Sequence, residues 1–266
     1  QTHPDHLHRH PDMEEAKCPA TIGQVAEAVR KFAGRFVRDH PHTGLGTDAV
    51  CALHTYTLEC GLYVDMNAAL RSGDPGQVQV WWPFIHHLEA ALAKLPAFGA
   101  QVYRMMAPPD ARSGYTVGAY CVWSEFVSFT HSLDFVQLLV KQAHEAGEGG
   151  CLLVVCPLPR GRGRDIGAFS LLRDEREVVF PPNTWFQVEE EMGQGTKDLL
   201  ASRIRCPLKH LPTVYVLQEV CESDVPAAER SPLPLKLAEQ LLLAVRRGSR
   251  KACQAVMHAR ADIHTE

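Results

Sequence analysis

Two glutamates at alternate positions, Glu175 and Glu177, are the residues whose spacing is best suited to chemistry. Apolar residues flank them, which predicts a β-strand over residues 175–180. Because side chains alternate along a strand, both carboxylates would lie on one face, about 7 Å apart. Neighbouring carboxylates repel each other, so one pKa rises and the pair is suited to stabilise a cation or to move a proton. A solvated sheet edge explains the same spacing, and the spacing alone favours that interpretation.

An arginine and a run of hydroxyl groups lie upstream of these glutamates. Arg104 lies at the end of a predicted strand over residues 101–105, where a guanidinium can bind a phosphate through two hydrogen bonds. Residues 123–132 interleave hydroxyl and aromatic side chains ahead of a predicted helix. The ordinary interpretations are a surface arginine and a helix cap, so each signal is weak alone.

Composition excludes two classes of protein. The 266 residues are 45% hydrophobic and 22% charged, as in an ordinary soluble chain of one large domain or two modest ones. The net charge of −4 argues against a nucleic-acid partner, because such proteins usually carry a basic excess. No apolar run is long enough for a transmembrane helix, so we expect no membrane span.

The elements that must position these side chains change character along the chain. Apolar periodicity predicts helices over residues 21–38, 47–56, 65–71 and 83–95, and another over 132–146. Strands are predicted over residues 101–105, 115–122, 151–156, 175–180, 184–188 and 213–220, and residues 189–191 are expected to form a charged loop. A helical half followed by a strand-rich half indicates an α+β fold.

The two ends differ from this central part. Residues 1–20 form a polar, His-rich leader, for which a solvated tail is favoured over a metal site, and a targeting signal could be missing before Gln1. Residues 222–234 form a predicted linker, and residues 235–266 a helical tail that resembles the start of an ankyrin-like repeat; a plain helical cap is equally compatible. Nine cysteines without a CxxC pair favour an intracellular location.

Segments in a fixed order carry a family resemblance from residue 56 to residue 220. They are Tyr56-Thr57, Leu62 to Gly73, Ala90 to Pro96, Val102-Tyr103-Arg104, Gly114 to Gly118, Trp123 to Ser132, Phe169-Ser170, Glu175 to Pro182, Thr184 to Val188 and Val214 to Val220. In this order they resemble the R-S-E class of arginine-specific mono-ADP-ribosyltransferases. The resemblance implies a domain over residues 21–221, with a helical N-terminal part packed on a two-sheet β core.

The resemblance also implies the reaction and the residues for it. Such enzymes use NAD as a substrate, transfer ADP-ribose to an arginine of a protein acceptor and release nicotinamide, and this scheme requires no metal. Glu177 would stabilise the positive charge that grows on the ribose. Glu175 would orient and deprotonate the acceptor, and Ser128 would fix Glu177 and the nicotinamide ribose. Arg104 would hold the phosphates or the adjoining ribose.

Two further positions are assigned to NAD binding by the same resemblance, and the pattern departs from the family at one of them. Met105 occupies a place where relatives often have glycine, so its backbone would hold the nicotinamide amide while its side chain could narrow the site. Thr130 fills the last place of a Ser-Thr-Ser triplet. Residues 170–174 would meet the protein acceptor. The arginine-rich loop over residues 160–164 is expected to be solvated, with steering of phosphates as the alternative.

Three other functions compete with this interpretation. An NAD glycohydrolase would use the same residues with water as acceptor, and a catalytically weak NAD-binding module would serve recruitment, with a protein partner at the C-terminal helices. A glycosidase built on Glu175 and Glu177 is disfavoured, because its carboxylates flank the scissile bond from opposite sides.

Overall fold

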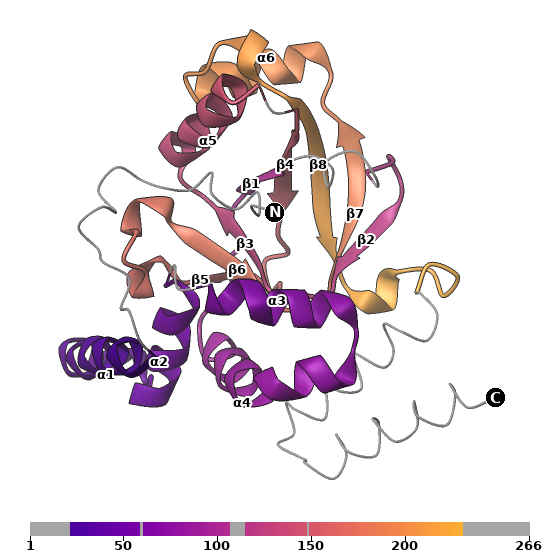
Figure 1. The fold of residues 1–266 in the computed structure, drawn as a ribbon. Coiled ribbons are helices and arrows are strands. Elements are labelled where there is room, and N and C mark those ends of the chain that lie inside the picture. Colours follow the sequence, from indigo (N-terminus) through magenta and orange to yellow (C-terminus); the bar gives the residue numbers. More distant parts are fainter. Residues whose placement is uncertain (1–21, 59–60, 107–114, 148, 231–266) are drawn as a thin grey trace.

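The computed structural model describes residues 22–58, 61–106, 115–147 and 149–230. The predicted leader over residues 1–20 and the predicted helical tail over residues 235–266, with its ankyrin-like repeat, lie outside these residues. The helices of the described part are α1 (Ile22–Asp39), α2 (Thr47–Tyr56), α3 (Leu62–Ser72), α4 (Pro75–Leu92), α5 (Leu133–Glu145) and α6 (Gln194–Arg203). The first four lie together at one end of the molecule (Figure 1).

Eight strands follow in the described residues. They are β1 (Val102–Met106), β2 (Tyr120–Trp123), β3 (Val127–Thr130), β4 (Cys151–Cys156), β5 (Arg164–Asp165), β6 (Glu177–Phe180), β7 (Thr184–Glu191) and β8 (Thr213–Val220). Their order across the sheet is β2-β7-β8-β4-β1-β3-β6-β5. The pairs are antiparallel except β4 with β8. The structure therefore agrees with the predicted mixture of helices and strands, and its sheet is mostly antiparallel.

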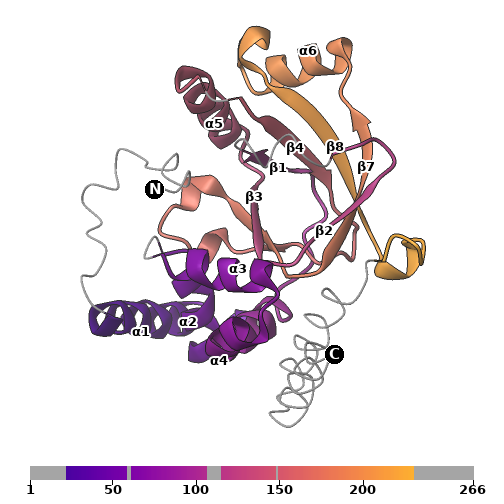
Figure 2. The ribbon, with the colours of Figure 1, turned by 45° about the vertical axis from the view of Figure 1, so that its right-hand side comes forward.

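The expected two-sheet core is replaced by one continuous sheet. The reason is that β1 pairs along both of its edges: it aligns with β4 over five residue pairs and with β3 at one pair, Tyr103 with Thr130. This narrow junction joins the β3-β6-β5 part to the longer strands. Figure 2 shows the two parts running in different directions on either side of β1, as expected where strand twist accumulates.

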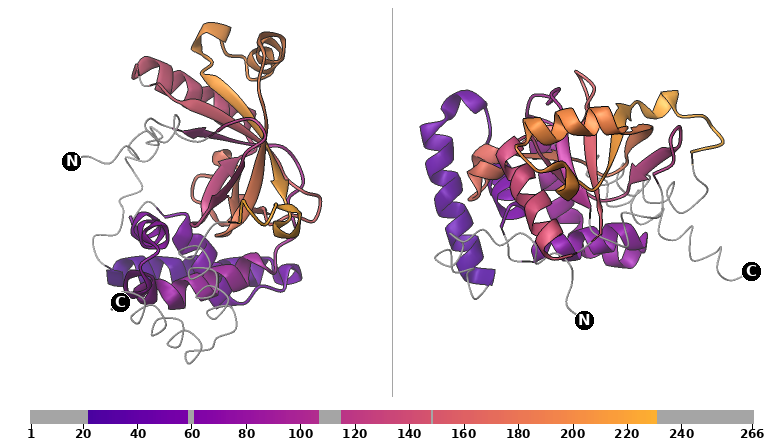
Figure 3. Two further views of the ribbon diagram at one scale, coloured as in Figure 1. Left: turned by 90° about the vertical axis from the view of Figure 1, so that its right-hand side faces the viewer. Right: turned by 90° about the horizontal axis from the view of Figure 1, so that it is seen from above.

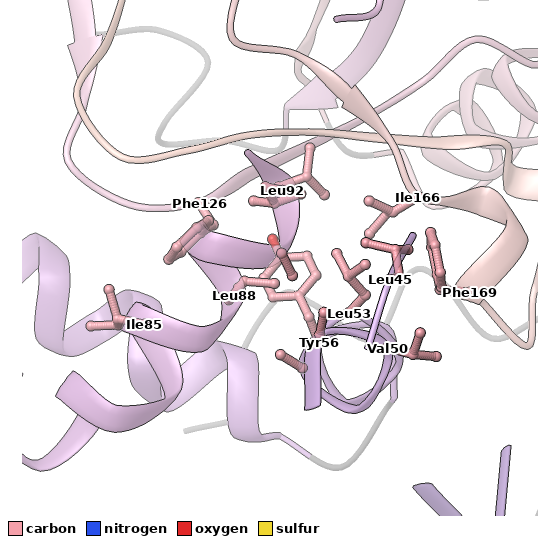
Figure 4. Close-up of a cluster of buried hydrophobic side chains, with 14 of the residues drawn as sticks. Leu45, Val50, Leu53, Tyr56, Ile85, Leu88, Leu92, Phe126, Ile166 and Phe169 are labelled. Carbon is pink, nitrogen blue, oxygen red and sulfur yellow. The ribbon is translucent and has the colours of Figure 1, made fainter. Parts of the chain in front are cut away.

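A hydrophobic core joins the helices α1, α2 and α4 to one end of the sheet. Its larger side chains come from both layers (Figure 4) and include Leu53, Tyr56, Ile85, Leu88, Phe126, Ile166 and Phe169. A second connection is polar: the side-chain amide of Asn67 donates to the carbonyl of Phe126 at 3.0 Å and accepts from its N–H at 3.2 Å. The start of β3 is thereby fixed against α3.

The helices α5 and α6 lie at the other end of the sheet, away from α1–α4 (Figure 3). Their apolar side chains, such as Val136, Val140 and Leu200, pack with Leu152 and Val154 of the central strand β4. A separate core cluster forms among the strands themselves, around residues such as Phe129, Phe180 and Phe186. The central strand β4 is therefore buried on both faces, as its continuous apolar sequence predicts.

Several elements differ from the sequence prediction. Helix α4 starts at Pro75 rather than residue 83, because Asp74 caps it by accepting from the N–H of Gly76 at 2.8 Å and proline is tolerated in the first turn. Pro83 lies inside this helix. Residues 189–191 extend β7 instead of forming a loop, and β3 and α6 were not predicted as elements.

The predicted linker begins as ordered structure. A short 3-10 helix, η7 (Glu222–Asp224), follows β8, and the side chain of Val225 is buried. Arg230 turns back and donates to the carbonyls of Val225 and Ser223, both at 2.8 Å. Among the described residues, no helix combines the length and apolarity needed to cross a bilayer.

Candidate active site

The pairing of β3 with β6 brings Ser128, Thr130 and Glu177 to one face of the sheet. The strands are antiparallel, with Thr130 opposite Glu177 and Ser128 opposite Val179. Since side chains alternate along each strand, these polar side chains face the helices, whereas Phe129 points into the core among the strands. Glu177 is the first residue of β6, and the three apolar residues that follow it in this strand are buried.

Burial strongly affects the carboxyl group of Glu177. Burial is the largest effect and raises its pKa to about 7. A hydrogen bond from Ser128 and the positive charge of Arg104 act in the opposite direction and lower the pKa. Glu177 therefore titrates near neutral pH, and a cation placed beside it would favour its ionised form.

The guanidinium of Arg104 is bound to the strand that carries Ser128. Its Nη1 donates to the backbone carbonyl of Ser128 at 2.7 Å, and its Nε donates to the sulfur of Met106 at 3.2 Å. A guanidinium carries five N–H donors, so these two bonds leave donors that an anionic ligand can use. Arg104 and Glu177 are thus brought together by Ser128, which interacts with both.

Met105 contributes to this region differently from the sequence expectation. Its side chain packs on the cluster formed by Tyr103, α5 and α6. Alternation along β1 puts that cluster on the opposite face from Arg104. The methionine side chain consequently does not narrow the space beside Arg104, and only the backbone of Met105 faces the neighbouring strands.

Glu175 does not lie on the strand, which corrects the predicted strand over residues 175–180. It ends a 3-10 helix, η5 (Arg173–Glu175), and Arg176 follows with a left-handed φ of 45°. The period-two rule therefore does not relate Glu175 to Glu177, because β6 begins only at Glu177. The left-handed residue breaks the strand between the two carboxylates.

Thr130 holds this turn in place. It is 4% exposed, its hydroxyl donates to the carbonyl of Glu175 at 2.5 Å and accepts from the N–H of Ser132 at 2.9 Å. The N–H of His131 donates to the carbonyl of Arg176 at 3.3 Å. A buried hydroxyl that donates and accepts in this way positions the loop before Glu177, and the contact of Thr130 with NAD stays a prediction.

Tyr56 is the residue of this region to which sequence reasoning assigned no role. It ends α2, is 3% exposed, and its hydroxyl lies 3.1 Å from that of Ser128. Burial and the nearby charge of Glu177 raise its pKa. The signals available in the sequence were a tyrosine on the apolar face of a predicted helix and its place in the family resemblance, and neither reveals a partner 72 residues away.

The arginine-rich loop is not solvated as expected. Arg162 donates to the carbonyl of Asn183 at 2.6 Å, and Arg164 donates to the carbonyls of Gly161 and Gly163 at 2.7 and 2.8 Å. The buried Glu219 accepts from the backbone N–H of Arg162 at 2.7 Å and from that of Leu158 at 2.8 Å. Arg162 and Arg164 thus act as structural donors to backbone carbonyls, whereas the side chain of Arg160 is exposed.

Within the described residues, no group of three or more His, Cys, Asp or Glu side chains is arranged to hold a metal ion. The candidate site consists of the carboxyl of Glu177, the hydroxyl of Ser128 and the guanidinium of Arg104. These groups can stabilise a positive charge next to a bound anion.

Comparison with known proteins gives the family. A curated relative, the NAD(+)--protein-arginine ADP-ribosyltransferase Tre1 of Serratia proteamaculans (strain 568), is 30% identical over 164 residues. This match covers 61% of the chain and 33% of Tre1, so the chain spans about a third of that relative's length.

Solved structures share the fold. ADP-ribosyltransferase HopU1 of Pseudomonas syringae pv. Tomato DC3000 is 20% identical, with a TM-score of 0.53 and coverage of 75% of this chain and 98% of HopU1. The Vis toxin, an ADP-ribosyltransferase from Vibrio splendidus, is 17% identical, with a TM-score of 0.50 and coverage of 81% and 94%. Vis has also been solved in complex with agmatine. The sequence itself matches the NAD:arginine ADP-ribosyltransferase family over residues 9–200, well over half of its length, and the chain belongs to that family.

Proposed function

We propose that this domain is a mono-ADP-ribosyltransferase of the R-S-E class that transfers ADP-ribose from NAD to arginine side chains of proteins and releases nicotinamide. One observation carries the proposal: in a chain of this family, Ser128 interacts with both Arg104 and a Glu177 carboxyl whose pKa is about 7. We propose residues 21–221 as the extent of the catalytic domain.

Glu177 is the proposed catalytic carboxylate. The C–N bond between nicotinamide and ribose breaks with its electron pair going to nicotinamide, so positive charge grows on the ribose. An ionised carboxylate beside the ribose stabilises the transition state more than the ground state. Because Glu177 is partly buried, this attraction is stronger than it would be in bulk water.

Arg104, Ser128 and the backbone of Met105 are the proposed NAD-binding groups. The donors that Arg104 does not use for Ser128 and Met106 suit a phosphate oxygen. Ser128 has a side chain on the same face as Glu177, which suits a hydrogen bond to the ribose that the carboxylate also contacts. The backbone of Met105 would hold the nicotinamide amide.

Glu175 is the proposed partner of the acceptor arginine. A nitrogen of the acceptor guanidinium bonds to the ribose carbon and loses a proton, which Glu175 accepts. The hydrogen bond from Thr130 to the Glu175 carbonyl fixes the backbone from which this side chain projects. Leu171 in the preceding loop is 59% exposed, and we propose that residues 170–174 contact the protein acceptor.

The proposal extends to the location and the partners of the protein. An intracellular location agrees with free thiols at six described cysteines (Cys51, Cys121, Cys151, Cys156, Cys206 and Cys221). A protein partner at the C-terminal helices and an ankyrin-like repeat rest on the sequence pattern of residues 235–266 alone. We further propose that protein arginines, and no nucleic acid, are the acceptors.

The experiment is incubation with NAD and agmatine, an arginine mimic, followed by mass spectrometry of the products for the wild type and Glu177→Ala. ADP-ribosyl-agmatine made by the wild type alone supports the proposal. Free ADP-ribose without labelled agmatine would indicate an NAD glycohydrolase instead. Absence of turnover combined with NAD binding would indicate a binding module, and full activity of Glu177→Ala would refute the assignment of that residue.

A further inference from the structure

Tyr56 and Ser128 form a hydrogen bond between the helical layer and the strand that carries the candidate site. The two hydroxyl oxygens are 3.1 Å apart. The ring of Tyr56 lies among the apolar side chains of the helical core, with its oxygen at the end directed away from α2 (Figure 4). It also packs against the rings of Phe126 and Tyr63, with centroid distances of 5.9 and 6.0 Å. The phenol is therefore held in one orientation.

The direction of the hydrogen bonds follows from counting protons. A serine hydroxyl has one proton to donate and lone pairs that accept. Ser128 supports the ionised form of Glu177 through a hydrogen bond, so its proton goes to the carboxylate. Its oxygen is then an acceptor, and the tyrosine must be the donor. Burial and the charge of Glu177 raise the pKa of Tyr56, which keeps this phenol protonated at neutral pH.

We propose that Tyr56 is a positioning residue for Glu177, acting through the hydroxyl of Ser128, in the reaction given as the proposed function. Ser128 is then fixed twice: Arg104 holds its backbone carbonyl at 2.7 Å, and Tyr56 holds its side-chain oxygen. Without the phenol, the Ser128 hydroxyl gains freedom among its staggered rotamers and points at Glu177 for less of the time.

The first test is Tyr56→Phe, which removes the hydroxyl and keeps the ring in the core. One hydrogen bond of ordinary strength corresponds to a decrease in kcat of about threefold to tenfold, with a smaller change in the KM for NAD. The acid limb of the pH profile should move to higher pH, because the ionised carboxylate loses support. Tyr103→Phe is the matched control, since among the described residues its hydroxyl donates to Gln101 at 2.8 Å, and it should retain the wild-type kcat.

A double-mutant cycle separates action through Ser128 from a general effect on the fold. In a Ser128→Ala background, Tyr56→Phe should change kcat by less than about twofold, since contacting residues are not additive. Equal losses in both backgrounds would overturn the proposal, as would a wild-type kcat and an unmoved acid limb in Tyr56→Phe alone.

A measurement without turnover distinguishes failure of this inference from failure of the proposed function. The carboxyl carbon of Glu177 can be titrated by NMR in protein labelled with ¹³C-glutamate and assigned by its loss in Glu177→Gln. Tyr56→Phe should raise the pKa read from that signal, and Tyr103→Phe should not. An unchanged pKa would overturn the inference even if the enzyme is active, and a raised pKa would support it even if agmatine is not the acceptor.

Discussion

Two glutamates of this molecule, Glu177 and Glu219, lie near arginines and are shielded from water to different degrees, and they serve different purposes. Burial is the largest effect on each and raises both pKa values. Glu219 is 2% exposed and accepts from two backbone N–H groups at 2.7 and 2.8 Å. Glu177 begins a strand, is only partly buried, and has a serine hydroxyl and a nearby guanidinium as support.

The difference shows that a raised pKa does not by itself mark a catalytic carboxyl. The carboxylate of Glu219 accepts a hydrogen bond from the backbone N–H of Arg162. The neighbouring Gly161 lies so close that a Cβ at this position would collide with the same carboxylate. Among the described residues, Glu177 is supported by Ser128 and Arg104 and not by backbone donors of this kind. Its ionised form is therefore stabilised best when a cation approaches, which is the property that the proposed reaction needs.

The largest expected effect separates the two carboxyls by activity. Glu177→Gln should lower kcat for ADP-ribosyl-agmatine formation by about a hundredfold to a thousandfold, because it removes a charge directed at the transition state. Glu219→Gln keeps the shape of a buried structural group and should remain within about twofold of the wild type. Rates are compared at a temperature where circular dichroism shows all proteins folded. An equal decrease in kcat in Glu177→Gln and Glu219→Gln would contradict the assignment of a catalytic role to Glu177 alone.

Substitution of Glu219 should lower the free energy of unfolding more than substitution of Glu177. Glu219→Ala leaves the N–H groups of Leu158 and Arg162 without their acceptor inside the protein, which should lower the free energy of unfolding by about 2 to 5 kcal/mol. Urea denaturation measures this loss. Val179→Ala, a buried truncation on β6, is a useful reference for the cost of a cavity. A change below about 0.5 kcal/mol in Glu219→Ala would show that water replaces the carboxylate.

Glu177→Gln should instead stabilise the protein at alkaline pH. The folded-state pKa of Glu177, about 7, lies above the ordinary value of 4.5, so the folded state binds more protons between these values and stability falls as pH rises through them. Removing the charge relieves this cost by up to about 3 kcal/mol at pH 8, at about 1.4 kcal/mol per pKa unit. The gain should vanish below pH 4.5. Thermal unfolding at pH 4, 6 and 8 measures it, and a gain independent of pH would contradict the assignment.

The sequence predicted best the elements whose pattern is local. Residues 151–156 and 213–220 match β4 and β8 at both ends, because a continuous apolar run and a β-rich stretch specify strands without help from neighbours. Strand β3 was missed because Ser128 and Thr130 precede a helix and resemble its cap. Only pairing with β6, about 50 residues away, makes them part of a sheet.

The sequence identified the residues of the candidate site but not the hydrogen bonds and the backbone conformation that position them. Family resemblance selected Arg104, Ser128 and Glu177, and the fold brings these groups together. The strand period wrongly coupled Glu175 to Glu177, since a single left-handed residue, Arg176, is not visible in a pattern of apolar positions. The hydroxyl contact of Tyr56 and the use of Arg162 by a backbone carbonyl depend on tertiary packing, which composition and spacing do not encode.

The most direct test of the central claim is the pH dependence of kcat/KM for nicotinamide release by the wild type, measured between pH 5 and pH 9. This profile reports ionisations of the free enzyme. If the ionised carboxylate of Glu177 stabilises the reacting ribose, kcat/KM rises with pH and levels off above an apparent pKa of about 7. A flat profile from pH 5 to pH 8, or an acid limb that persists in the residual activity of Glu177→Gln, would contradict the account.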